Sequence, residues 1–375
     1  GDFFLVAQLY VLGGLVSVVI ISGQLYMTIG VTSFSRTFLF TLLATTASIA
    51  CNSQDLSEQV FTGSTMGTTF RVGIIQEGIS DTPSGDIRRT IEAELDGVDR
   101  MMSHYRPDSE LSRFNAFRDT QPFSFTTDTF EVIKQGQEIA ALTDGAFDIT
   151  VGPLVAAWGF GVEQHNLPPT RATIVELLKH SGHDQLHLDF SAKSVRKRDP
   201  LIGFDLSAIA KGYAVDRVAS AIESKGVMQY MIEVGGEVRT RGLNASGEPW
   251  RIGIQVPDSK TQSIIQVVPL RDMAMATSGD YRSYYEVDGQ RISHTIDPRT
   301  GYPVTHALAS VTVVGTSCSW ADGMATALNV LGPTDGYRFA VAEGVAALML
   351  VRTDAGEFDQ KMTPAFEHLL QTDLQ

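Results

Sequence analysis

Imidazole, carboxylate and hydroxyl side chains are concentrated in two neighbouring motifs in the last third of the chain. The first is His294-Thr-Ile-Asp297-Pro-Arg-Thr-Gly301, and the second is Ala321-Asp322-Gly-Met-Ala325-Thr326. An imidazole can accept a proton near neutral pH, and carboxylate and hydroxyl oxygens are ligands that hard divalent cations prefer. The two motifs therefore predict a cation site with a proton acceptor beside it.

The second motif is expected to lie near the start of a helix that runs from about Ser319 to Leu331 and ends at Gly332. Asp322 and Thr326 are four residues apart, so a helix places both side chains on one face. With nearby carbonyl oxygens they could form the all-oxygen shell that Mg²⁺ prefers. The alternative is that Asp322 caps N–H groups at the start of the helix.

A further candidate ligand site is the segment Asp205-Leu-Ser-Ala208-Ile-Ala-Lys211-Gly212. Ser207 is expected to cap a helix that runs to Lys225 and stops at Gly226. The first N–H groups of such a helix can receive a phosphate, and Lys211, one turn in, could neutralise another oxygen. The alternative is an ordinary capped surface helix with a solvated lysine.

Other segments rich in glycine, hydroxyl or aromatic residues precede and follow these sites. They are Gly63-Ser-Thr-Met-Gly-Thr68, Met102-Ser-His-Tyr-Arg-Pro-Asp-Ser-Glu-Leu-Ser-Arg-Phe-Asn115, Gly145-Ala-Phe-Asp-Ile-Thr-Val-Gly-Pro-Leu154, Val234-Gly-Gly-Glu-Val238 and Ala276-Thr-Ser-Gly-Asp-Tyr-Arg282. On the residues alone, the first is a turn with Met66 as a core filler, and Tyr105 is a half-buried aromatic residue. The stretch Ala146-Phe-Asp148 is then a loop after a helix, where backbone groups are free to bond a ligand.

Together, and in this order, the motifs between about Val60 and Gly332 resemble those of the FAD:protein FMN transferase (ApbE) family. The resemblance implies an α+β fold in which mixed or antiparallel sheets are flanked by helices and the flavin binds in a cleft. It implies FAD contacts at Met66, Tyr105, Ala146, Phe147, Asp148, Asp205, Lys211 and Ile296. It also implies magnesium contacts at Ala208, through its backbone carbonyl, and at Asp322, Ala325 and Thr326.

The same resemblance implies a reaction. The enzyme is expected to use Mg²⁺ to transfer FMN from FAD, its donor substrate, to a threonine or serine hydroxyl of an acceptor protein, with release of AMP. The expected acceptors are flavoprotein subunits of membrane respiratory complexes. His294 is assigned as general base or as a residue that positions the substrate, and a structural histidine is the alternative. A Mg²⁺-dependent FAD pyrophosphatase and a non-catalytic flavin-binding lipoprotein remain alternative functions.

Hydrophobic spacing and turn residues predict the elements that must position these groups. Helices are expected over about 86–102 and 128–142, and the second would start with a capping box formed by Asp128 and Glu131. Strand-like runs lie at 229–234, 250–256, 264–270, 309–314 and 346–351. The dipeptide Asp288-Gly289 indicates a hairpin. This mixture of hairpins and isolated helices favours an α+β fold over a doubly wound one.

The composition fits a globular protein and argues against one class of partner. The chain has 375 residues, 43% of them hydrophobic, and a formal net charge of −14. It is long enough to bury a sizeable core in one large domain or two closely joined ones. Because no long basic stretch offsets the acidic balance, a nucleic-acid partner is not expected.

The first fifty residues are apolar, and between Phe3 and Ala50 only Arg36 carries a formal charge. We interpret residues 1–50 as an over-extended start followed by a lipoprotein signal peptide, with Cys51 as the lipidated residue. The alternative is a transmembrane helix from Phe3 to Ile21. Residues 51–59 would then form a linker and residues 60–375 the catalytic domain. A lipid anchor at Cys51 predicts a protein attached to the inner membrane and facing the periplasm.

Overall fold

The computed structural model describes residues 5–11, 14–21, 24–30, 57–76, 84–257, 263–279 and 283–372. The chain divides into two compact units, residues 1–53 and residues 54–375. The predicted lipidation residue Cys51 and residues 31–50 of the apolar stretch before it lie outside the described residues.

The smaller unit contains a three-stranded antiparallel sheet. Its strands are β1 (Leu5–Val11), β2 (Gly14–Ile21) and β3 (Gln24–Gly30). Strands β1 and β2 therefore lie within the segment Phe3–Ile21, for which a transmembrane helix was the alternative interpretation. None of the helices in the described part of the chain is long and apolar enough to span a membrane.

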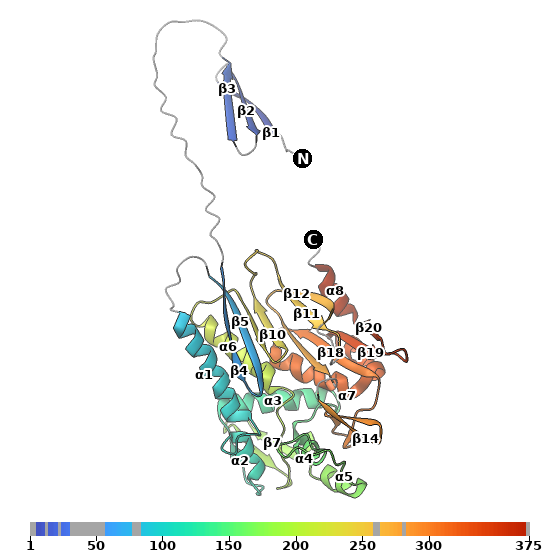
Figure 1. Ribbon diagram of the computed structural model, residues 1–375. Helices are drawn as coiled ribbons and strands as arrows, with labels where there is room; N and C mark the ends of the chain where they lie inside the picture. The colour runs from blue at the N-terminus through green and yellow to red at the C-terminus, as the bar shows by residue number, and fades with distance from the viewer. Residues whose placement is uncertain are drawn as a thin grey trace. The chain divides into compact units, whose positions relative to one another are not determined.

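The larger unit is built on an eight-stranded antiparallel sheet with the order β20-β19-β18-β13-β10-β9-β5-β4 (Figure 1). In that order the strands are Phe358–Met362, Ala346–Arg352, Leu308–Gly315, Ala274–Gly279, Glu237–Arg241, Tyr230–Val234, Thr68–Gln76 and Ser57–Thr65. Every residue of β18 from Leu308 to Val314 is buried, as expected for a strand that is covered on both faces.

Different elements cover the two faces of this sheet (Figure 1). Helices α1 (Ser84–Met102), α6 (Ala210–Glu223) and α7 (Cys318–Ala342) pack with the sheet into the main core. On the other face, the hairpin of β11 (Trp250–Gln255) and β12 (Ile264–Leu270) packs with α8 (Pro364–Thr372). The mixed helix and antiparallel-sheet architecture confirms the expected α+β fold.

The remaining elements connect these layers. The helices are α2 (Glu110–Ala116), α3 (Thr127–Leu142), α4 (Gly152–Ala157) and α5 (Arg171–Leu178), with short 3₁₀ turns at Ile149–Val151 and His183–Gln185. The strands are β6 (Phe123–Ser124), β7 (Leu186–Asp189), β8 (Ser194–Lys197), β14 (Tyr284–Val287), β15 (Gln290–Ser293), β16 (Ile296–Asp297) and β17 (Tyr302–Pro303).

Several predicted elements are confirmed with small shifts. The helix expected over 86–102 is α1, and each predicted strand run contains a strand. Asp288 and Gly289 both have positive φ and close the β14–β15 hairpin. Helix α7 breaks at Gly332 as expected, where φ is 80°, but then continues through Pro333 to Ala342.

The predicted cap at Ser207 is wrong. Helix α6 starts only at Ala210, after a turn in which Asp205 Oδ1 accepts hydrogen bonds from the Ser207 amide at 2.8 Å and from its hydroxyl at 2.5 Å. The Ser207 hydroxyl, which was expected to cap the helix, therefore donates to Asp205 instead.

The predicted capping box at Asp128 is also wrong. Asp128 lies inside the first turn of α3 and accepts a hydrogen bond from the Tyr213 hydroxyl of α6. The start of α3 is held instead by Glu110, whose carboxylate accepts from the amide and hydroxyl of Thr126 and from the hydroxyl of Thr129. A carboxylate distant in the sequence therefore takes the role that local spacing gave to Asp128.

Candidate active site

A cluster of one partly exposed lysine and two buried carboxylates lies where α6 and α7 meet the β9–β10 hairpin. Lys211 Nζ is 2.6 Å from Glu237 Oε1 and 4.0 Å from Asp322 Oδ1. The side chains of Glu237 and Asp322 are only 3% and 6% exposed. Lys211 is therefore not the solvated surface lysine of the alternative interpretation. When both carboxyl groups are ionised, two carboxylates against one ammonium give the cluster a net negative charge.

Close backbone approaches bring these residues together. Gly212 N donates to Asp322 Oδ2 at 3.0 Å, and a Cβ at Gly212 would lie 2.5 Å from Cys318 O. Only glycine lets α6 approach the start of α7 so closely. Gly235, with φ of 63°, lies in the β9–β10 turn, where a Cβ would be 2.9 Å from Thr68 Cγ2. The turn that carries Met66 immediately precedes Thr68, so it adjoins the same cluster.

Asp216 on α6 fixes the start of α7. Its carboxylate accepts hydrogen bonds from the amides of Cys318 at 3.1 Å and Ser319 at 3.0 Å, and it pairs with Arg239. A carboxylate at a helix N-terminus satisfies open N–H groups and interacts favourably with the helix dipole. The position of Asp322, less than two turns along α7, is thereby set relative to α6.

Burial changes the proton affinity of all three groups in the cluster. Burial and the charge of Asp322 raise the pKa of Glu237 to about 7, against the opposing effect of Lys211. Burial likewise raises the pKa of Asp322. Burial alone would lower the pKa of Lys211, but the two carboxylates outweigh it and raise that pKa above its usual value. Strong perturbations of this kind are typical of functional sites.

A second polar group surrounds the turn before α6. His104 Nδ1 lies 3.5 Å from Ser207 Oγ and 3.8 Å from Asp205 Oδ1. Its ring centroid is 4.2 Å from that of Tyr105, which is 57% exposed and so open to stacking by a ligand. Asp205 N donates to Ile149 O at 2.8 Å, which links this turn to the Ala146–Asp148 segment.

The segment Ala146–Asp148 is almost completely buried. Burial raises the pKa of Asp148, although its carboxylate accepts a hydrogen bond from Thr150 N at 2.8 Å. The Phe147 ring packs in the main core beside Gly323 of α7. The predicted FAD contacts at Ala146 and Phe147 would therefore come from backbone groups, because their side chains are used in packing.

His294 and Ile296 belong to a different group, beside α4. His294 Nδ1 is 2.9 Å from the Ser283 carbonyl oxygen, and the ring stands edge-on to Phe160 at 6.2 Å. A carbonyl can only accept, so Nδ1 is the donor in this contact. Ile296 is 5% exposed in a small apolar cluster with Trp158, so a contact to FAD there would again involve the backbone.

Asp297 does not join His294 and Asp322 in one cation-binding set. Its two oxygens bind Arg299 Nε and Nη2, both at 2.9 Å, and its Oδ1 also accepts from the Arg299 amide. This bidentate pair closes the turn before β17 and occupies the carboxylate. The expectation that the first motif supplies a carboxylate for the cation is therefore corrected, and Asp322 remains as the carboxylate for that role.

The residues predicted to bind magnesium lie on two adjoining elements. Asp322, Ala325 and Thr326 are on α7, and Ala208 is in the turn before α6. Among the described residues no three His, Cys, Asp or Glu side chains form a metal-binding group. A shell of one carboxylate, one hydroxyl and backbone carbonyls would not need such a group, and the excess negative charge beside it suits a divalent cation.

Sequence reasoning gave no role to Glu237 or His104. Glu237 stands in the Val234–Val238 motif, but nothing in its spacing connects it with Lys211, which is 26 residues away. His104 precedes the predicted stacking residue Tyr105, and its Nε2 is buried without a hydrogen-bond partner among the described residues. The only sequence feature that could have pointed to a function was the position of Glu237 in a glycine-rich motif and of His104 beside the aromatic residue Tyr105.

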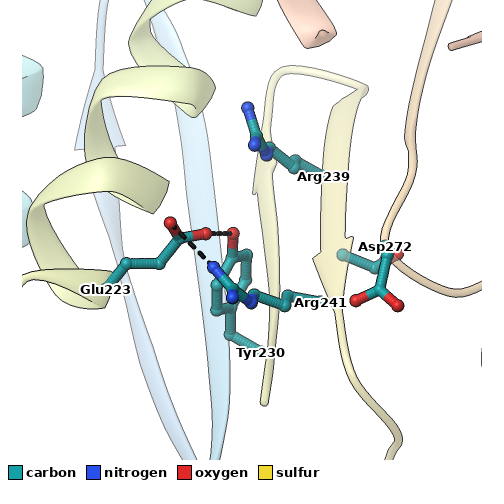
Figure 2. Close-up of a pocket in the computed structure, with 6 residues that line it drawn as sticks. Glu223, Tyr230, Arg239, Arg241 and Asp272 are labelled. Carbon is teal, nitrogen blue, oxygen red and sulfur yellow. Dashed lines mark hydrogen bonds and ion pairs between the residues drawn. The ribbon is translucent and has the colours of Figure 1, made fainter. Parts of the chain in front are cut away.

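A separate polar cavity of about 290 Å³ lies at the other end of the β9–β10 hairpin (Figure 2). It is lined by Glu223, Tyr230, Arg239, Thr240, Arg241 and Asp272. Figure 2 shows Glu223 reaching both the Tyr230 hydroxyl and the Arg241 guanidinium. Because these groups satisfy one another, the cavity is a weaker candidate than the Lys211 cluster.

Comparisons with known proteins identify relatives of the whole larger unit. Residues 66–349 match the model of the ApbE family. The chain is 43% identical over 317 residues to the FAD:protein FMN transferase of Vibrio cholerae, which covers 84% of this chain and 93% of the relative. It is 38% identical over 314 residues to the FAD:protein FMN transferase of Escherichia coli K12, covering 83% and 89% of the two chains.

Solved structures give the same result. The flavin transferase ApbE from Vibrio cholerae superposes with a TM-score of 0.76 at 41% identity, covering 84% of this chain and 99% of the other. The apo form of the flavinyl transferase ApbE from Pseudomonas stutzeri superposes with a TM-score of 0.77 at 38% identity, covering 84% and 97%. The similarity therefore extends over both sequence and fold.

Proposed function

This chain belongs to the ApbE family, and on that premise we propose that it transfers FMN from FAD to a threonine or serine hydroxyl of an acceptor protein. The observation that carries the proposal is the Lys211–Glu237–Asp322 cluster, which lies beside the Met66 turn on the helix that follows the Asp205 turn. Such a cluster combines a cation for phosphate oxygens with carboxylate oxygens for a metal ion. FAD is then the donor substrate and not a redox cofactor.

The metal ion in this proposal is Mg²⁺, held by the side chains of Asp322 and Thr326 and by the backbone carbonyls of Ala208 and Ala325. When bound, it supplies positive charge for the oxygens of the pyrophosphate. Lys211 binds a further phosphate oxygen, and Tyr105 offers an exposed ring for stacking. These residues orient the pyrophosphate for attack in line with its bridging oxygen.

The acceptor hydroxyl attacks the FMN-side phosphorus and forms a phosphoester. The bond from this phosphorus to the bridging oxygen breaks, and that oxygen leaves with AMP. His294, which Ser283 O holds through Nδ1 at 2.9 Å, is the proposed acceptor of the hydroxyl proton. The roles of Met66, Asp148 and Ile296 are to position FAD, with Ile296 acting through its backbone.

If water attacked in place of the acceptor hydroxyl, the same site would act as an FAD pyrophosphatase. If neither reaction took place, the protein would only bind flavin. Incubation of the purified protein with FAD, Mg²⁺ and a candidate acceptor separates the three functions. We expect FMN to become covalently attached to the acceptor. Free FMN with AMP would indicate hydrolysis, and unchanged FAD would contradict both enzymatic functions.

We also propose that the protein is anchored to the inner membrane through lipid on Cys51 and faces the periplasm. The support is the apolar leader that ends in Ala47-Ser-Ile-Ala-Cys51. This location would bring the enzyme to acceptor flavoprotein subunits of membrane redox complexes. Replacing Cys51 by serine is expected to abolish labelling by a radioactive fatty acid. Equal labelling of the variant and the parent protein would refute the lipid anchor.

A further inference from the structure

We propose that Glu237 is a positioning residue that holds the Lys211 ammonium away from the Asp322 carboxylate, so that this carboxylate stays open to a divalent cation. The inference rests on the metal-dependent transfer proposed above. It deepens that function by giving a role to a buried carboxylate that is not among the expected ligands.

The geometry of the cluster places Lys211 between two competing carboxylates. Its Nζ is in hydrogen-bond contact with Glu237 Oε1 at 2.6 Å, whereas Asp322 Oδ1 is at 4.0 Å. A movement of about 1 Å would convert the longer separation into a direct ion pair. A lysine in that position would neutralise Asp322 and compete with a metal ion for its oxygen.

Glu237 is fixed well enough to hold the lysine in place. It is the first residue of β10 and pairs with Val234 across the Gly235-Gly236 turn. Gly235 in this turn lies beside the Lys211 side chain, since a Cβ there would be 3.4 Å from Lys211 Cδ. Strand pairing thus fixes the backbone of Glu237, and its side chain, only 3% exposed, has little room to move away from Lys211.

The second oxygen of Glu237 argues against a purely structural role. Glu237 Oε2 is buried without a hydrogen-bond partner among the described residues. Glu223, near the other end of the same hairpin, has one oxygen bound by the Tyr230 hydroxyl and the other by Arg241. A carboxylate retained only for stability is expected to be satisfied as Glu223 is, because an unpaired buried oxygen is costly.

The test is a double-mutant cycle on the full-length protein. Mn²⁺ binding is measured by the loss of the free-ion EPR signal, at saturating FAD and without acceptor. The four proteins are the parent, Glu237→Gln, Lys211→Met and the double variant, each checked by thermal unfolding. We expect Glu237→Gln to weaken Mn²⁺ binding about tenfold in the parent, and to have little effect in the Lys211→Met background.

Two results would overturn the role of Glu237. Equal weakening by Glu237→Gln in both backgrounds would mean that it acts on the metal or the fold without Lys211. Unchanged binding in the parent background would mean that it does not control the site at all. The matched control, Glu223→Gln, changes the same residue type near the other end of the hairpin and should leave Mn²⁺ affinity unchanged.

Asp322→Ala distinguishes failure of this inference from failure of the proposed function. Loss of Mn²⁺ binding in Asp322→Ala, combined with additive effects of Glu237 and Lys211, would remove only the role of Glu237. Parent-like Mn²⁺ affinity and parent-like transfer in Asp322→Ala would refute the metal site itself, and the inference with it.

Discussion

The two ends of the β9–β10 hairpin carry similar side chains in opposite states. At the open end, Tyr230 pairs with Arg241 across the strands, and Glu223 of α6 bonds both side chains. At the turn end, Glu237 bonds Lys211 through one oxygen while its other oxygen is buried without a partner in the described part of the chain. The first network is charge-balanced, whereas the second sets two buried carboxyl groups, Glu237 and Asp322, against the single ammonium group of Lys211.

This difference separates a network whose polar groups are satisfied by the protein itself from one that leaves a carboxylate oxygen for a ligand. A buried polar group is normally satisfied by the protein itself, as at Glu223. An unsatisfied carboxylate close to a second one, Asp322, raises the free energy of the protein unless a cation binds. Changes at the open end should therefore lower stability and spare catalysis, whereas changes at the turn end should lower catalysis more than stability.

The largest effect is expected for Asp322→Ala. Loss of the only charged ligand in the proposed metal site should slow transfer on the order of 10³-fold, whereas loss of the acceptor for Gly212 N should lower the melting temperature only modestly. The measurement is the rate of acceptor flavinylation at saturating FAD and limiting Mg²⁺, with thermal unfolding as control. A folded variant that turns over at the parent rate would contradict the claim that the turn end carries catalysis.

His294 lies outside both ends of the hairpin, so its replacement tests whether catalysis extends beyond the turn end. His294→Ala should slow single-turnover transfer by about 10²-fold or more, with little change in FAD affinity. The parent rate should rise with pH through an ionisation that the variant lacks, because only the neutral ring accepts a proton. Unchanged rates and pH profile would return His294 to a structural role.

The smallest effect is expected at the open end, where Glu223→Gln should leave transfer unchanged. Burial would raise the pKa of Glu223, but the Tyr230 hydroxyl and Arg241 outweigh it and lower that pKa. A lowered carboxyl pKa stabilises the protein above the unfolded value of about 4.3, and this stabilisation is lost as pH falls through the folded pKa.

Denaturant unfolding across pH measures this contribution. The free energy of unfolding of Glu223→Gln should be about 1–3 kcal/mol lower than that of the parent at pH 7. The difference should shrink as the pH falls below about 4. A difference that is constant with pH would show that the glutamate acts by packing and not by charge.

The sequence indicated which chemical groups the site contains better than it indicated which contacts bring them together. The helical spacing of Asp322 and Thr326 and the α+β pattern could be read from the sequence, and α7 carries both residues. The role of Glu237 could not, because its partner Lys211 is brought near only when β10 pairs in the sheet beside α6. Pairing over such distances is set by tertiary packing.

Local signals also failed where two groups compete for one partner. Asp128 and Glu131 have the spacing of a capping box, yet Asp128 accepts from Tyr213 and Glu110 holds the start of α3. Likewise, Asp297 has the right chemistry for a cation ligand, but Arg299 occupies both of its oxygens. Propensity and spacing identify the groups that are present, but the tertiary fold determines which hydrogen bond or ion pair each of them makes.

The most direct test of the account is the ratio of AMP released to FMN bound covalently to the acceptor, measured in single-turnover reactions with Mg²⁺ and with EDTA. The account predicts a ratio close to one with Mg²⁺, and neither product with EDTA. A ratio well above one would contradict transfer in favour of hydrolysis, and undiminished transfer in EDTA would contradict the metal-dependent site at Asp322.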